Sequence, residues 1–119
     1  MRKIINIGEN EVALASNAAT AILYKQTFHE DLLKSVSNLS ATSGDVLEAV
    51  EKIQKLAFIM AKQAEGTPFS VLSKELTEDG FVEWLCAFEE SDFMDPAALI
   101  GVLGVWNKNF QSASEAKNA

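Results

Sequence analysis

The chain has 119 residues, of which 48% are hydrophobic and 23% charged, a composition typical of one ordinary globular domain. Its net charge of −7 argues against nucleic acid and anionic membrane surfaces as partners, because both are bound through clustered Lys and Arg. Cys86 is the only cysteine, which excludes an internal disulfide and fits a reducing setting. The N-terminus lacks the apolar core of an export signal, and no apolar run approaches the roughly 20 residues of a membrane span, so we expect a cytoplasmic protein.

A β-hairpin is predicted for the first fifteen residues. The β-branched Ile4, Ile5 and Ile7 precede a Gly-Glu-Asn turn, and Val12 and Leu14 follow it with the alternation of a half-buried strand. Because two strands alone are only marginally stable, the hairpin must lie on the helices or pair with another chain. Its edge is therefore one candidate surface for self-association.

A first helix is expected over residues 18–33, capped by Ser16 or Asn17. The His-Glu-Asp segment at residues 29–31 marks either a break or a fresh first turn, since acids favour a helix N-terminus. The serine-rich residues 35–43 that follow are typical of a loop or of a frayed helix end.

The clearest helical pattern runs from Asp45 to Ala64 and predicts the central core helix. Asp45 is the expected cap, and Gly66 with Pro68 stops the helix. One face carries an apolar side chain at every third or fourth position, and residues 56–61 are apolar nearly all round. The face comprises Val46, Val50, Ile53, Ala57, Met60 and Ala64, and the outer side is expected to hold the ion pairs Glu48–Lys52 and Glu51–Lys55.

Three shorter helices are expected next. The first spans residues 68–76, with proline at its first position. The second is capped by Thr77 or Asp79 and carries, at helical spacing, Phe81, Trp84, Leu85 and Phe88. The third starts at the Asp-Pro pair of residues 95–96, passes Trp106 and continues to Phe110.

Gly101 and Gly104 lie inside this third helix, where each costs about 1 kcal/mol relative to alanine. They predict the close approach of another helix and mark a second candidate surface for self-association. Residues 111–119 are small and polar and are predicted to be a disordered tail. The predicted fold is mainly α: residues 1–110 form a single compact helical domain of about five helices with a short N-terminal β-hairpin.

The stretch from Glu75 to Asn107 holds eight acidic residues, two tryptophans and no Lys or Arg. An acidic surface over aromatic, helix-forming sequence favours a module that binds a protein partner over a catalyst. We therefore expect a groove built from the last two helices. The candidate partner-binding residues are Trp84, Phe88, Glu89, Glu90, Asp92, Phe93 and Trp106, although each aromatic side chain is also suited to the core.

No catalytic, cofactor-binding or metal-binding residue is predicted, and no cofactor is expected. The single histidine, His29, is far in sequence from Cys86, which excludes the common zinc patterns. The acids of residues 89–95 alternate loosely like those of a calcium loop, but the central glycine and the terminal glutamate are missing. Catalysis by carboxylates would need a pocket that the sequence does not indicate.

The chain has a Tyr-Lys-x-x-Phe-x-x-Asp-Leu-Leu motif near its start and a Trp-Asn pair near its end. The residues are Tyr24, Lys25, Phe28, Asp31, Leu32, Leu33, Trp106 and Asn107. In this order they resemble the tail assembly chaperones of long-tailed bacteriophages, in particular a small helical group of that family. The resemblance extends from Ile4 to Asn109 and includes Phe81-Val82-Glu83-Trp84-Leu85 before the acidic stretch.

The resemblance implies a mainly helical protein that forms spiral homo-oligomers and coats the tape-measure protein before the tail tube polymerises around it. It implies action in the cytoplasm of the bacterial host cell and absence from the mature virion. In that family a frameshifted longer form recruits the major tail-tube protein, and this chain would correspond to the short form. An alternative from another class is a small acidic helical regulator, of the antitoxin or anti-activator type, that masks a basic protein partner.

Overall fold

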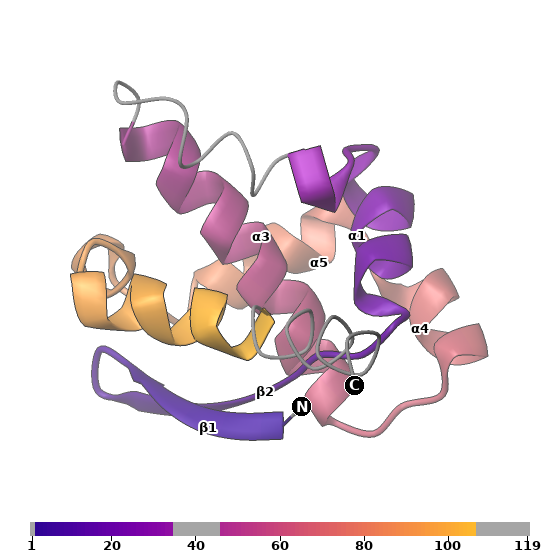
Figure 1. Ribbon diagram of the computed structural model, residues 1–119, viewed down its shortest axis with the longest axis horizontal. Helices are drawn as coiled ribbons and strands as arrows, with labels where there is room; N and C mark the ends of the chain where they lie inside the picture. Colours follow the sequence, from indigo (N-terminus) through magenta and orange to yellow (C-terminus); the bar gives the residue numbers. More distant parts are fainter. Residues whose placement is uncertain (1, 35–45, 107–119) are drawn as a thin grey trace, which may run out of the picture.

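The computed structural model describes residues 2–34 and 46–106. These residues form a mainly helical domain with an N-terminal antiparallel hairpin, as the sequence predicts (Figure 1). The expected loop at residues 35–43, the Asp45 cap, Asn107, Phe110 and the tail at 111–119 lie outside the described residues. Among the helices of the described part, none combines the length and the apolar character needed to cross a bilayer.

The hairpin pairs β1 (Arg2–Ile7) with β2 (Asn10–Ala15) across a turn at Gly8 and Glu9. Gly8 has a φ of 63°, a conformation that glycine adopts without steric penalty and that suits the first central position of a tight hairpin turn. Ile7 and Leu14 are fully buried, whereas Ile4 on the opposite face is 61% exposed. One face of the hairpin therefore covers the helices, which confirms the first of the two predicted alternatives.

The first helix, α1 (Thr20–Phe28), is shorter than predicted at both ends. Its N-cap is Ala19, without a side-chain capping bond, so the cap predicted at Ser16 or Asn17 is wrong, although Asn17 Oδ1 accepts a hydrogen bond of 2.8 Å from the N–H of Ala19. Ser16 does not cap the helix: its buried hydroxyl donates to the carbonyl of Val105 at 3.0 Å and so ties the chain to the last helix. At the other end, His29 adopts a left-handed φ of 57°, which makes residues 29–31 a break before a short helical turn at 32–34.

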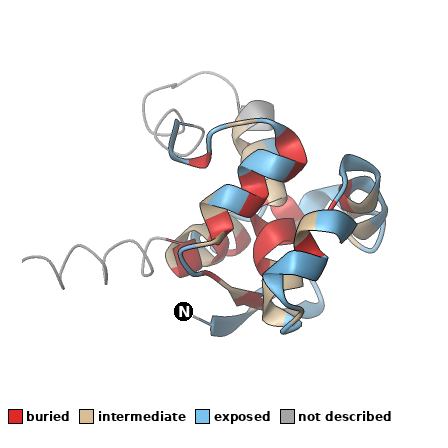
Figure 2. Ribbon diagram, turned by 90° about the vertical axis from the view of Figure 1, so that its right-hand side faces the viewer, coloured by how far each residue is buried: buried red, intermediate tan, exposed pale blue. Residues whose placement is uncertain are grey.

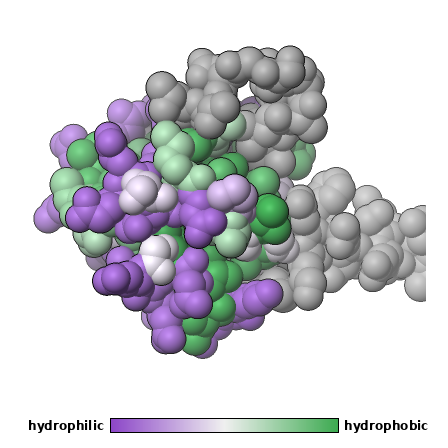
Figure 3. All heavy atoms as spheres, turned by 90° about the vertical axis from the view of Figure 1, so that its left-hand side faces the viewer, coloured by the Kyte–Doolittle hydropathy of each residue, from purple (hydrophilic) through white to green (hydrophobic). Residues whose placement is uncertain are grey.

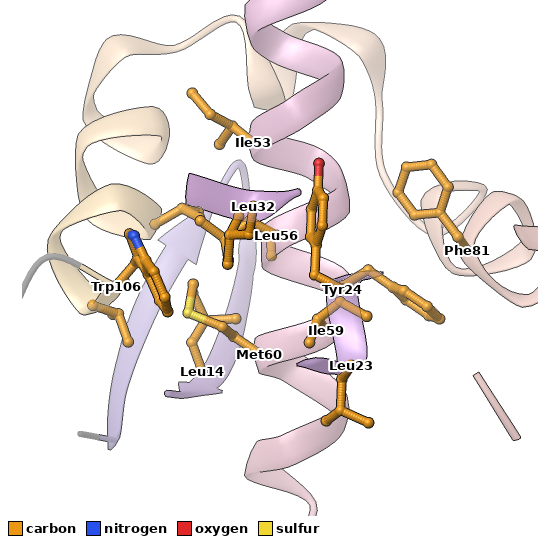
Figure 4. Packing of buried hydrophobic residues seen from close by; sticks show 14 of the residues in the cluster. Leu14, Leu23, Tyr24, Leu32, Ile53, Leu56, Ile59, Met60, Phe81 and Trp106 are labelled. Atoms are coloured by element: carbon orange, nitrogen blue, oxygen red, sulfur yellow. The ribbon is translucent and has the colours of Figure 1, made fainter. Parts of the chain in front are cut away.

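The long helix α3 (Val46–Ala64) forms the centre of the domain, as predicted. All residues from Leu56 to Met60 are buried, because β2, α1 and α5 each pack against a different side of the helix. Figure 4 shows side chains from the hairpin, α1 and the last helix gathered around α3, and Figure 2 shows buried positions on the inward faces of the helices. The predicted Glu51–Lys55 ion pair forms, with Lys55 Nζ 3.2 Å from Glu51 Oε1. Lys52, predicted to pair with Glu48, forms an ion pair with Glu30. The Glu48 side chain lies outside the described part.

The predicted shorter helices are α4 (Phe69–Glu75), α5 (Glu78–Leu85) and a helix at residues 96–106, with a 3-10 helix, η1 (Glu90–Phe93), before the last. Pro68 is the cap of α4 and not its first helical residue. Thr77 caps α5, its Oγ1 accepting from the N–H of Gly80 at 3.0 Å. The helix α5 ends before Phe88, which was expected inside it. Asp95 caps the last helix by accepting from the N–H of Ala97 at 3.0 Å.

The neighbour of Gly101 is the hairpin and not another helix. A Cβ placed on Gly101 would lie 3.3 Å from Ile5 Cδ1, so the glycine makes room for this β1 side chain. Gly104 has no nonlocal atom of the described chain within 4 Å of such a Cβ. The predicted contact with a helix is therefore wrong for Gly101, whose face packs on the hairpin within the same chain.

Candidate functional site

The structure divides the aromatic residues predicted to bind a partner into two groups. Trp84 and Phe88 are half-buried and reach the surface. Phe93 and Trp106 are only 1% and 6% exposed, because they fill the core between η1, the last helix and α3. Phe93 and Trp106 are thus not surface anchors in this conformation, and the interpretation of these two residues as core is the correct one.

A continuous row of aromatic rings connects α1 to the surface. Phe28 on α1 contacts Phe81 on α5 at 5.1 Å, and Phe81 contacts Phe58 on α3 at 5.6 Å, measured between ring centroids. Phe58 then contacts Trp84 at 5.7 Å, and Trp84 contacts Phe88 at 4.8 Å. Such tilted and edge-on pairs add stability beyond simple burial. Trp84 is therefore held in place from its buried side while its other side stays accessible.

Two of the three predicted acidic contact residues have structural tasks. The Glu89 side chain accepts from the backbone N–H of Asp92, and Asp92 Oδ2 accepts from the N–H of Glu89 at 2.9 Å, which forms a capping box for η1. Asp92 also packs against Gly8 of the hairpin turn. Only Glu90 is a simple exposed acid. Figure 3 views this side of the molecule, where hydrophilic side chains dominate and hydrophobic ones form small separate patches.

One concavity is a groove of about 400 Å³ where α3, α4 and α5 meet. We call it the α3–α4–α5 groove. Its floor consists of the buried side chains of Phe58, Leu72 and Leu76, and Trp84 forms one wall. Its exposed rim carries the three carboxylates of Glu65, Glu75 and Glu83, and the partly exposed Lys62 also lines the groove.

This location differs from the groove expected between the last two helices. Trp84 is the only predicted partner-binding residue that lines it, and α3 and α4 supply most of the floor. The apolar run at residues 56–61 indicates a core position for Phe58, and nothing local shows that its ring also lines a groove. The acids at 75 and 83 belong to the acidic stretch, but only the fold brings them to the same concavity.

Lys62 places its amine inside this groove. Its Nζ lies 3.7 Å from Glu65 Oε1 and 6.0 Å from the centroid of the Phe58 ring, a distance at which a cation is attracted by an aromatic face. The Lys62 side chain is 34% exposed, so the amine remains in contact with water. The groove thus already contains one cation, supplied by its own chain.

A separate ionic cluster fastens the end of α1 to α3. Glu30 accepts from Lys52 at 2.6 Å and from Lys55 at 3.0 Å. Burial by itself would raise the pKa of Glu30, but the hydrogen bonds from both lysines outweigh it and hold the pKa below its ordinary value. Burial would likewise lower the pKa of Lys55, and the carboxylates of Glu30 and Glu51 outweigh it and raise the pKa.

A second hollow of about 400 Å³ lies between the hairpin turn and η1, lined by Glu9, Asn10, Ala87, Glu89 and Asp92. Two of its carboxylates form the capping box described above.

Within the described residues, no group of three or more His, Cys, Asp or Glu side chains is placed to hold a metal ion. Cys86 is exposed.

A scan against protein-family models gave no match, and searches of curated proteins and of solved structures likewise returned none. A functional assignment for this chain therefore depends on its own residues and geometry.

Proposed function

We propose that this chain is a non-catalytic tail assembly chaperone that binds the tape-measure protein of a long-tailed bacteriophage and keeps it soluble while tail-tube subunits polymerise. The observation that carries the proposal is the α3–α4–α5 groove, with its apolar floor, its tryptophan wall and its acidic rim. The resemblance of the sequence to tail assembly chaperones supplies the identity of the partner. The proposal includes homo-oligomers, a frameshifted longer form that recruits the major tail-tube protein, and action in the host cytoplasm.

The groove suits a polypeptide better than a small reactant. A helix binds in a groove by placing a few apolar side chains on a hydrophobic floor, and the surrounding polar rim sets its orientation. Phe58, Leu72 and Leu76 provide such a floor, and the amphipathic Trp84 is of a residue type enriched among interface anchors. A net charge of −7 supports solubility of a complex with an aggregation-prone partner.

The structure explains what the family-like opening motif does. Tyr24, Phe28 and Leu32 are buried core residues, and Asp31 Oδ1 accepts from the backbone N–H of Lys34 at 3.2 Å at the start of the short turn at 32–34. Lys25 and Leu33 are exposed. The motif therefore encodes mainly how α1 packs on the rest of the domain, and it supports a shared fold more directly than a shared binding surface.

The test is co-expression of the chain with the tape-measure protein encoded next to it. We expect the tape-measure protein to stay in the supernatant and to co-purify with the wild-type chain, and to aggregate without it. Trp84→Ala should reduce co-purification, whereas Val82→Ala, on an exposed position of the same helix, should not. Circular dichroism and thermal melting of both variants verify folding. A tape-measure protein that aggregates equally with and without the wild-type chain would refute the proposal.

The acidic rim also favours the second candidate, a regulator that masks a basic protein. Gene neighbourhood separates the two functions, because a tail chaperone is encoded just ahead of a very large reading frame for the tape-measure protein. A gene that instead adjoins a small basic toxin or activator would favour the regulator. Pull-down of that neighbour by the chain would then be the corresponding measurement.

A further inference from the structure

The charges around the α3–α4–α5 groove are unbalanced. Its lining contains the three acids Glu65, Glu75 and Glu83 against the single base Lys62, a net charge of −2. Lys62 pairs with Glu65 at 3.7 Å. Within residues 2–34 and 46–106, no cation lies within ion-pair distance of Glu75 or Glu83. Two carboxylates of the rim are thus open to a cation from outside.

Lys62 shows what kind of group this groove holds. Its amine lies over the Phe58 ring and beside Glu65, so an aromatic face and a carboxylate together receive a cation. Lys62 can leave this position without unfolding the domain, because its long side chain is partly exposed and its last atoms can turn into water. An incoming cation would find the same aromatic face together with two further carboxylates.

We propose that the groove recognises a Lys or Arg side chain on an amphipathic helix of the bound polypeptide, and that this side chain takes the place of Lys62. The cation would lie over Phe58, next to the carboxylates of Glu75 and Glu83, while neighbouring apolar side chains rest on Leu76 and Trp84. A volume of about 400 Å³ holds a few side chains and not a whole helix, so the helix would lie across the groove. This inference rests on the proposed function, because it specifies the chemistry of the segment that is sheltered.

The same geometry disfavours an acidic helix. Its carboxylates would meet Glu75 and Glu83 at close range and would lose hydration without gaining a partner. A basic helix is also attracted at longer range by the net negative charge of the chain. The acidic rim of the groove would thus provide specificity for a basic segment, and its apolar floor would provide affinity.

The experiment uses two fluorescein-labelled helical peptides with the same apolar face, one with Lys and Arg on the polar face and one with Glu. Fluorescence anisotropy with the full chain should show binding of the basic peptide only, weakened by added NaCl. The double variant E75Q/E83Q should bind the basic peptide about tenfold more weakly, because each lost ion pair is worth roughly a two- to fivefold factor. The matched control E78Q/E90Q removes two exposed acids outside the groove and should change affinity less than about twofold.

A substitution at Lys62 should change the affinity for the basic peptide in the opposite direction. K62M keeps the aliphatic stem and removes the internal competitor, so the basic peptide should bind about threefold more tightly. K74M removes the same charge from an exposed position outside the groove and should have a smaller effect. The change in net charge is identical in these two variants, so a larger effect of K62M shows that the cation inside the groove competes with the bound one.

Three results would overturn the inference: equal binding of the acidic peptide, an equal loss of affinity in E75Q/E83Q and E78Q/E90Q, or a K62M effect no larger than that of K74M. The same variants separate it from the proposed function. If the tape-measure protein still co-purifies with E75Q/E83Q in wild-type amount, the basic-segment inference fails and the chaperone function stands. If the basic peptide binds as described and the tape-measure protein does not, the groove chemistry stands and the chaperone function fails.

Discussion

Replacing Gly8 by alanine tests how firmly the hairpin turn is packed against η1. Gly8 has a positive φ of 63°, and a Cβ built on it would overlap the carboxylate of Asp92. Gly66, after the end of α3, offers a matched control, because its φ of 81° is also positive but nothing lies within 4 Å of its Cβ position. The two substitutions thus share the backbone penalty and differ in the contact.

The positive φ alone costs a non-glycine residue about 1–2 kcal/mol of folding free energy. At Gly8 the added methyl group must also displace Asp92, whose capping box at η1 is worth about 1 kcal/mol. We therefore expect Gly8→Ala to lower the free energy of unfolding by about 2–3 kcal/mol and Gly66→Ala by about 1–2 kcal/mol. For a domain of this size, the first value corresponds to a fall in Tm of roughly 10 °C.

Urea denaturation of the single variants and of the double variant Gly8→Ala/Asp92→Ala measures the coupling between the two residues. In the Asp92→Ala background, the additional effect of Gly8→Ala should shrink to that of Gly66→Ala, a coupling of about 1 kcal/mol. Equal effects of Gly8→Ala in both backgrounds would refute the contact between the hairpin turn and η1. So would a Gly8→Ala effect no larger than that of the Gly66 control.

Further outcomes follow from the packing and the ion pairs. Glu30→Gln should lower the free energy of unfolding by about 1 kcal/mol at pH 7. The lowered pKa of Glu30 provides stability above the ordinary glutamate pKa that is lost as pH falls through the lowered value, so urea denaturation should show the two proteins converging in acid. Ile59→Ala, at a fully buried position, should cost about 2–5 kcal/mol by the same assay, whereas Ile4→Ala should stay within about 0.5 kcal/mol. Gly104→Ala should raise Tm, because alanine stabilises a helix by about 0.5–1 kcal/mol relative to glycine. The added Cβ meets no nonlocal atom of the described chain. A fall in Tm would contradict this.

The elements whose sequence pattern is local and periodic were predicted well. Apolar residues from Val50 to Met60 recur at helical spacing and widen to nearly all faces, which indicates a helix surrounded by other elements, and α3 is such a helix. The hairpin, the Asp95 cap and the cap of α5, where Thr77 was one of two candidates with Asp79, were likewise predicted from residue types that act on their immediate neighbours. These features depend on interactions within a few residues, which a single sequence displays.

The candidate site was predicted only in part. Trp84 and Phe93 are both aromatic residues in an acidic stretch, and their sequence surroundings do not show that one reaches the surface and the other is buried. Glu89 and Asp92 were expected at a binding surface, but they cap η1, a task that becomes visible only when the short 3-10 turn is known. The floor of the groove joins α3 to α4 and α5, and no local pattern indicates which helices will meet.

By itself the sequence determined that this chain is a mainly helical domain with an N-terminal hairpin, a strongly negative charge and one long central helix. Backbone propensity, capping and hydrophobic periodicity act between near neighbours and can therefore be recognised in the sequence. The tertiary structure alone decided which side of each aromatic ring is covered, which acids have structural partners and where Lys62, Glu75 and Glu83 share one groove. Those properties arise where segments distant in the chain pack together, and packing is a relation between surfaces that no single segment contains.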